Sequence, residues 1–173
     1  SELYPVSQDF ARLNTVLVEA YAAEPSRGQF QRITEKLQKH GAGFALRVMA
    51  SHGGTISTEA KELARTLVSG PIGGVVGAQY LAKQLGFENV VCSDIGGTSF
   101  DLALITGGKF SIKTQPDMAR FVLKLPLIEI DSVGAGTGSF VRLTPTSKRI
   151  EIGPDSAGYR IGVSNPKGGI QTV

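Results

Sequence analysis

Apolar residues in the first 40 positions recur at the three- and four-residue spacing of α-helices. They predict one helix from Pro5 to about Ala22 and a second over Gln29–His40. Pro25 and Gly28 are expected to interrupt helical structure between the two, because proline lacks the N–H that a helix needs and glycine is a poor helix former. The residues that carry the pattern are Phe10, Leu13, Leu17 and Ala20, then Phe30, Ile33 and Leu37.

Two further helices are predicted in the middle of the chain. Ser57 or Thr58 is a candidate cap for a short helix that runs through Ala64. A longer helix is predicted from Ser69 to about Leu85, because Pro71 lies in its first turn and Gly86 follows its end.

Strands are predicted where apolar runs lie between turn residues. In chain order they are Phe44–Met49, Val90–Asp94 (expected to be buried), Phe100–Ile105, Lys109–Thr114, Phe121–Ile130, Ser139–Leu143 and Arg149–Ile152. Thr106-Gly107-Gly108 is a hairpin signal and Gly134–Gly138 a glycine turn. Because helices come first and a cluster of strands follows, the order indicates an α/β or α+β class with a mixed sheet.

The composition narrows the class of protein. With 173 residues, 41% hydrophobic and 19% charged, the chain is long and apolar enough to form a core. The net charge of +3 comes from scattered basic residues, so no basic stripe indicates nucleic-acid binding. No apolar stretch approaches the roughly 20 residues of a membrane span, and no signal pattern opens the chain. The single cysteine, Cys92, fits a reducing cytoplasm and, within its apolar run, a buried structural role.

The strongest chemical feature is Asp94-Ile95-Gly96-Gly97-Thr98-Ser99-Phe100-Asp101, which lies between two predicted strands. Two glycines in such a turn leave backbone N–H groups free to point into one concavity, which suits phosphate oxygens. The hydroxyls of Thr98 and Ser99 can donate further hydrogen bonds. Asp94, at the strand end, is placed to hold a hydrated Mg²⁺.

An ordinary hairpin with a glycine turn is the simpler alternative for this segment. The combination of two aspartates, two glycines and two hydroxyls favours a phosphate site over that alternative. It is not a Walker loop, because no Gly-Lys-Ser/Thr follows. It is not a dinucleotide-binding loop either, because a strand rather than a helix follows the glycines.

Here the chain resembles a known family. Asp94–Asp101 looks like the second phosphate loop of the actin-like ATPase superfamily. Four motifs in this order resemble the hydantoinase A, 5-oxoprolinase and acetone carboxylase family: Ser69–Ala78, Asp94–Asp101, Ile130–Ser139 and Gly153–Gly158. The resemblance covers nearly the whole chain and implies part of an actin-like, ribonuclease H-like lobe with a mixed sheet flanked by helices.

The resemblance implies two regions. Residues 1–68 would be the end of the first ATPase lobe, and residues 69–173 the connecting helix with the phosphate-2 strands of the second lobe. Gly73, Gly74, Gly77 and Ala78 make one side of the connecting helix smooth, so either a lobe hinge or plain tight packing is expected there. The family's first phosphate loop is absent from these residues, so we expect them to supply at most half of an ATP site.

The implied activity is ATP-dependent phosphorylation of a carbonyl or amide oxygen, with Mg²⁺. By analogy Asp94 is the ligand of the metal through water, and Asp101 is a second partner or a base that orients water. Gly96, Gly97, Thr98 and Ser99 would hold phosphate. Gly136 and Thr137, in the second glycine loop (Gly134–Gly138), would line the nucleotide or substrate cleft, although a structural turn is the alternative for that loop.

Thr137 indicates which branch of the family the chain resembles, because hydantoinases and oxoprolinases usually carry three glycines where this chain has Gly136-Thr137-Gly138. The resemblance favours an acetone- or acetophenone-type carboxylase that acts on a ketone and bicarbonate. Its implied partners are a hydantoinase B-type large subunit, in which Mn²⁺ is possible, and a small subunit. The alternatives are an ATP-dependent hydrolase of a cyclic amide and a non-catalytic actin-like module controlled by nucleotide.

Overall fold

The computed structural model describes residues 2–118 and 120–158. Its helices are α1 (Asp9–Lys39), the 3₁₀ helix η1 (Leu63–Thr66) and α2 (Ser69–Leu85). Its strands are β1 (Arg47–Met49), β2 (Thr55–Ser57), β3 (Val90–Ile95), β4 (Phe100–Thr106), β5 (Lys109–Phe110), β6 (Ile112–Lys113), β7 (Asp117–Met118), β8 (Phe121–Val122), β9 (Leu127–Ile128), β10 (Asp131–Val133), β11 (Ser139–Leu143) and β12 (Ile150–Ser156).

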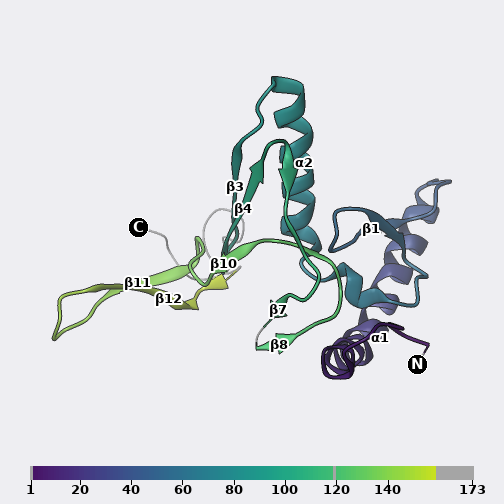
Figure 1. Ribbon diagram of the computed structural model, residues 1–173, viewed down its shortest axis with the longest axis horizontal. Helices are drawn as coiled ribbons and strands as arrows, with labels where there is room; N and C mark the ends of the chain where they lie inside the picture. The colour runs from purple at the N-terminus through teal and green to yellow at the C-terminus, as the bar shows by residue number, and fades with distance from the viewer. Residues whose placement is uncertain (1, 119, 159–173) are drawn as a thin grey trace.

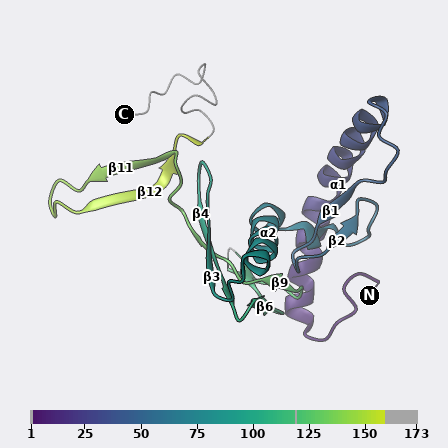
Figure 2. The same cartoon turned by 90° about the horizontal axis from the view of Figure 1, so that it is seen from above.

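Helix α2 occupies the middle of the molecule. The β3–β4 hairpin lies along one side of it, and α1 with the β1–β2 pair lies on the other (Figures 1 and 2). The β11–β12 hairpin projects away from α2 on the side opposite α1. Helices and strands therefore combine as the α/β class requires.

The largest sheet has the order β10-β4-β3, with β5 also paired to β4. Every strand pair in the described ranges is antiparallel, whereas the sequence predicted a mixed sheet. The reason lies partly in the connections: β3 to β4 and β4 to β5 are joined by short turns, which can link only antiparallel neighbours. The hairpin predicted at Thr106-Gly107-Gly108 is confirmed, with Thr106 opposite Lys109.

The prediction of two N-terminal helices was wrong, because α1 continues through Pro25 as one helix of 31 residues. In Figure 1 its first turns are seen end-on and its later turns from the side, so the helix changes direction along its length. A proline within a helix is a known cause of such bends. The face that carries the apolar pattern is also the exposed one: Phe10 is 74% exposed and Leu17 54% exposed.

Two other local predictions also need correction. Of the short helix expected to run through Ala64, only the last two residues are helical, in η1, and residues 58–62 lie in no helix or strand. The strand at Val90–Asp94 exists as β3, but it is not buried. Helix α2 covers one face of the β3–β4 hairpin, while on the other face Val91 and Leu104 are 67% and 65% exposed.

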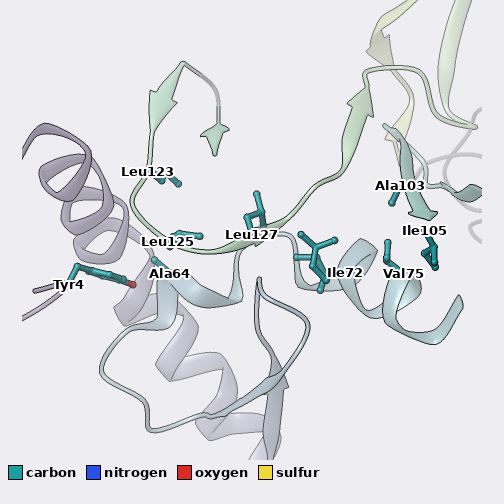
Figure 3. Close-up of a cluster of buried hydrophobic side chains, with 10 residues drawn as sticks. Tyr4, Ala64, Ile72, Val75, Ala103, Ile105, Leu123, Leu125 and Leu127 are labelled. Atoms are coloured by element: carbon teal, nitrogen blue, oxygen red, sulfur yellow. The ribbon is translucent and has the colours of Figure 1, made fainter. Parts of the chain in front are cut away.

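The core joins segments that are distant in the sequence. Leu123, Leu125 and Leu127, from the extended stretch after β8, lie between α1 and α2 (Figure 3). Side chains of α1 form hydrogen bonds with β8 and with this stretch: Asn14 donates to the carbonyl of Val122 at 3.1 Å, and the Thr15 hydroxyl accepts from the amide of Lys124 at 2.7 Å. The core extends from there past Ile72 and Val75 of α2 to the β4 side of the sheet.

A buried carboxylate connects α1 to η1. Glu19 is 3% exposed, and its oxygens accept hydrogen bonds from the amides of Leu63 at 2.9 Å and Ala64 at 2.7 Å. The hydroxyl of Tyr4 donates to the same carboxylate at 3.1 Å. Burial raises the pKa of the Tyr4 phenol, and the charge of Glu19 raises it further. Glu19 therefore satisfies the free amides at the start of η1 from a distant helix.

We expect Glu19→Ala to lower the free energy of unfolding by about 3 kcal/mol, because buried N–H groups lose a charged acceptor. Urea unfolding of the full-length protein measures the change. Glu24→Ala, on the exposed side of the same helix, is the control and should change stability by about 0.5 kcal/mol or less. Equal losses in the two variants would contradict the role given to Glu19.

Candidate functional site

The candidate phosphate loop, Gly96–Ser99, is the turn of the β3–β4 hairpin, as the sequence predicted. Asp94 pairs with Asp101 and Ile95 with Phe100 across the two strands. The amide of Gly96 donates to the carbonyl of Ser99 at 2.9 Å and closes the turn. The four residues of the turn therefore form the loop that connects the two strands of the hairpin.

The turn presents three amides that are free to bind a ligand. In the described part of the chain, the N–H groups of Gly97, Thr98 and Ser99 donate no hydrogen bond. The backbone carbonyls of Gly96 and Gly97 are instead occupied by the second glycine loop. Consecutive unpaired amides of this kind form an anion-binding concavity.

Two carboxylates lie side by side at the base of the loop. Asp94 and Asp101 are direct cross-strand partners, and like charges in that position destabilise a sheet. Among the described residues no lysine or arginine forms an ion pair with either of them. The hydroxyl of Ser99 donates to Asp101 at 3.3 Å, and Asp94 is exposed. The uncompensated pair favours a bound cation.

Asp94 and Asp101 also line a cavity of about 340 Å³ between the hairpin and α2. The wall on the α2 side includes Pro71 and Gly74. A side chain at Gly74 would meet nothing within 4 Å, so the close backbone packing expected for this glycine side is not made by the residues described here. The smooth side of α2 instead gives the two carboxylates open space.

The second glycine loop contacts the turn directly. The amide of Thr137 donates to the carbonyl of Gly96 at 2.9 Å, and the amide of Gly138 donates to that of Gly97 at 2.8 Å. A Cβ at Gly136 would lie 2.5 Å from the Gly96 oxygen and 2.6 Å from the Thr98 nitrogen. The structure thus brings Gly136 and Thr137 to the predicted site, where their observed contacts are with the turn itself.

The described residues contain no group of three or more His, Cys, Asp or Glu side chains that could hold a metal ion. A metal held by Asp94 through water does not need such a group, since Mg²⁺ usually keeps several waters and takes its remaining ligands from phosphate. Unpaired amides beside carboxylates are groups of the kinds that bind phosphate and hydrated Mg²⁺.

Sequence reasoning missed two serines in this site. The hydroxyl of Ser156 donates to the carbonyl of Gly97 at 3.1 Å, and the hydroxyl of Ser139 accepts from the amide of Gly136 at 2.8 Å. Both serines lie within the motifs that carry the family resemblance. The contact of Ser139 is local to its own loop. The contact of Ser156 depends on how the β11–β12 hairpin is placed against the turn, and no local pattern shows that.

The family model described as hydantoinase/oxoprolinase matches residues 12–173. The chain belongs to this family. It is 60% identical over its whole length to the acetone carboxylase beta subunit of Xanthobacter autotrophicus, covering 24% of that protein. It is 31% identical over 87% of its length to the acetophenone carboxylase gamma subunit of Aromatoleum aromaticum, covering 21% of that subunit.

A solved structure supports the same relationship. The nucleotide-free structure of an acetone carboxylase superposes with a TM-score of 0.86 at 60% identity, covering 98% of this chain and 24% of the other. This member of the hydantoinase/oxoprolinase family therefore spans about a quarter of the length of its carboxylase relatives. The family resemblance inferred from the four motifs is confirmed.

We expect Gly136→Ala to lower the free energy of unfolding by about 1–3 kcal/mol, because the added methyl group would overlap the turn. Gly134→Ala is the matched control: a Cβ there meets nothing within 4 Å. Thermal unfolding of the two variants measures the difference. Equal stability of both would mean that the loop does not pack on Gly96–Ser99 as the structure has it.

Proposed function

We propose that this chain supplies the phosphate loop of the ATP-binding subunit of an ATP-dependent ketone carboxylase of the acetone or acetophenone type. The observation that carries the proposal is the glycine turn whose three consecutive amides are unpaired in the described residues. The 60% identity to an acetone carboxylase beta subunit supports the choice of reaction. The chain spans about a quarter of that relative, so the activity of the whole enzyme is part of this proposal.

In this proposal the amides of Gly97, Thr98 and Ser99 hold phosphate oxygens. The hydroxyl of Thr98 is exposed beside them and can add a further hydrogen bond. Bound ATP supplies the phosphoryl group that activates the ketone and bicarbonate. The turn offers no large side chain that would block its approach, since glycine occupies two of its four positions.

In this proposal Asp94 and Asp101 have different roles. Asp94, the more exposed of the two, holds Mg²⁺ through water. Asp101 is half-buried and accepts a hydrogen bond from Ser99, so its carboxylate is held in place to orient a water or the shell of the metal. A divalent cation between these carboxylates and the phosphates offsets the repulsion among all three groups.

The assembly we propose follows from the same family. The two carboxylase relatives are named as a beta and a gamma subunit, which supports a hetero-oligomer. We propose a hydantoinase B-type large subunit, with Mn²⁺ possible in it, and a small subunit as partners. No described helix is long and apolar enough to cross a membrane. The cytoplasm remains our proposal for the location, from the single cysteine.

The actin-like lobe and its boundary are also proposals. The division into residues 1–68 and 69–173 is supported by α2, which begins at Ser69 and leads directly into β3. The core crosses that boundary, because Leu123 and Leu125 pack in one cluster with Tyr4 and Ala64. We therefore expect any lobe movement to occur about α2 itself and to carry the β3–β4 hairpin with it.

The alternative is an ATP-dependent hydrolase of a cyclic amide. The family description, hydantoinase/oxoprolinase, favours it as second candidate. Both reactions would use the same phosphate loop, and they differ in the group that receives the phosphoryl. The loop geometry thus supports ATP use in general, and the identity to carboxylase subunits supports the ketone.

We expect Asp94→Asn to lower kcat for substrate-dependent ATP hydrolysis about 100-fold or more in the full-length complex, because the carboxylate that orients the metal loses its charge. The melting temperature should not fall, since the change also removes a like-charge repulsion across the hairpin. The control is Glu88→Gln, an exposed carboxylate outside the site, which should keep full activity. An active Asp94→Asn variant would contradict the metal role.

Substrate choice separates the two candidate reactions. We expect the full-length complex to hydrolyse ATP when acetone and bicarbonate are added together, and to remain at its background rate with hydantoin or 5-oxoproline. Phosphate release measures both arms in one assay. Stimulation by a cyclic amide alone would replace the carboxylase with the hydrolase.

A further inference from the structure

The carbonyl oxygens of the phosphate loop are held by more than the two backbone hydrogen bonds. The Gly96 oxygen accepts from the amide of Thr137 and also from its hydroxyl, at 3.3 Å. The Gly97 oxygen accepts from the amide of Gly138 and also from the hydroxyl of Ser156, at 3.1 Å. Each of the two carbonyls therefore has two donors, one from the backbone and one from a side chain.

These four hydrogen bonds also determine where the amides point. A peptide unit is planar and trans, so its C=O and N–H groups point in opposite directions. The Gly96 carbonyl shares a peptide unit with the Gly97 amide, and the Gly97 carbonyl shares one with the Thr98 amide. Anchoring both oxygens on the second glycine loop consequently directs both N–H groups away from that loop.

Ser156 is itself held in one orientation. Its oxygen accepts a hydrogen bond from the amide of Gly158 at 2.9 Å, which leaves its proton for the Gly97 carbonyl. The next residue is tied to the same loop, because the amide of Ala157 donates to the Gly138 carbonyl at 2.8 Å. Pairing of Ser139 with Ser156 brings the end of β12 to the turn.

We propose that Ser156 is a positioning residue of the phosphate loop, which it orients by anchoring the Gly97 carbonyl, with the hydroxyl of Thr137 acting in the same way on Gly96. This inference rests on the proposed function, since it assumes that the loop binds the phosphates of ATP. Neither hydroxyl needs to touch the nucleotide. Both act through the rotation of a peptide plane, so their removal should weaken phosphate binding more than it disturbs the rest of the protein.

The test uses the full-length subunit in its complex and MgATP as the probe. We expect Ser156→Ala to raise the Kd for MgATP about threefold to tenfold, which corresponds to the loss of one neutral hydrogen bond. The KM for MgATP should rise with it, while the KM values for acetone and bicarbonate stay unchanged. Ser111→Ala, an exposed serine outside the site, is the matched control.

Thr137 offers a second variant that is safe for folding, because its side chain is exposed. Thr137→Val removes the hydroxyl and keeps the backbone amide, and we expect about a twofold to threefold rise in the Kd for MgATP. Thr137→Ser keeps the hydroxyl and should restore the original affinity. This pair decides the question if Ser156→Ala does not fold.

The outcomes distinguish failure of the proposed ATP binding from failure of the positioning role. If the unchanged subunit does not bind MgATP, the proposed function is wrong and this inference falls with it. If it binds MgATP and the hydroxyl-deleted variants bind equally well, the positioning role is wrong while the function stands. A uniform rise in all three KM values together with a lower melting temperature would show a structural role only and would also overturn the inference.

Discussion

The candidate site depends on the contact between two glycine loops that lie about forty residues apart in the chain. The carbonyls of Gly96 and Gly97 turn toward Gly136–Gly138, and the amides of the same peptide units turn outward. Gly138 is buried in this contact, and a Cβ there would lie 2.6 Å from the Gly97 oxygen. Any larger residue at this position would overlap the turn, so the two backbones can meet only because glycine has no side chain.

The register of β3 with β4 places two like charges opposite each other beside this contact. Asp94 and Asp101 face each other across the hairpin with no ion-paired lysine or arginine among the described residues. A sheet selected only for stability would not keep like charges in register. The pair stands at the edge of a cavity beside the smooth side of α2. The two carboxylates, the cavity and the three unpaired amides thus lie at the same end of the hairpin. This is the combination that the proposed binding of Mg²⁺ and phosphate would use.

The rest of the fold holds this end of the hairpin in place. Helix α2 packs Ile72 and Val75 against the β4 side of the sheet. The extended Leu123–Ile128 stretch connects that core to α1, where the Thr15 hydroxyl accepts from the amide of Lys124. Buried Glu19 then joins α1 to η1, just before α2 begins. Packing and hydrogen bonds therefore connect the first helix, through η1 and α2, to the hairpin that carries the candidate phosphate loop.

Elements whose signals are local were predicted well from the sequence. Helix α2 begins and ends where Pro71 and Gly86 indicate, and the β3–β4 turn has the glycines that its geometry needs. Local signals failed where burial decides. Apolar spacing placed Phe10 and Leu17 on one face of α1, but that face is exposed, and polar Asn14, Thr15 and Glu19 lie inside. Pro25 indicated a break, yet the helix continues through it.

By itself the sequence determined the family and the β3–β4 turn that is the candidate phosphate loop, with an aspartate on each side, because these depend on residue types at fixed short spacing. Only the tertiary structure decided that Thr137 and Ser156 donate hydrogen bonds to the loop, that β3 is exposed on one face, and that Glu19 is a buried cap. The reason is physical. Hydrogen-bond partners and burial depend on which distant segments meet in space, and residue spacing along the chain does not predict those contacts.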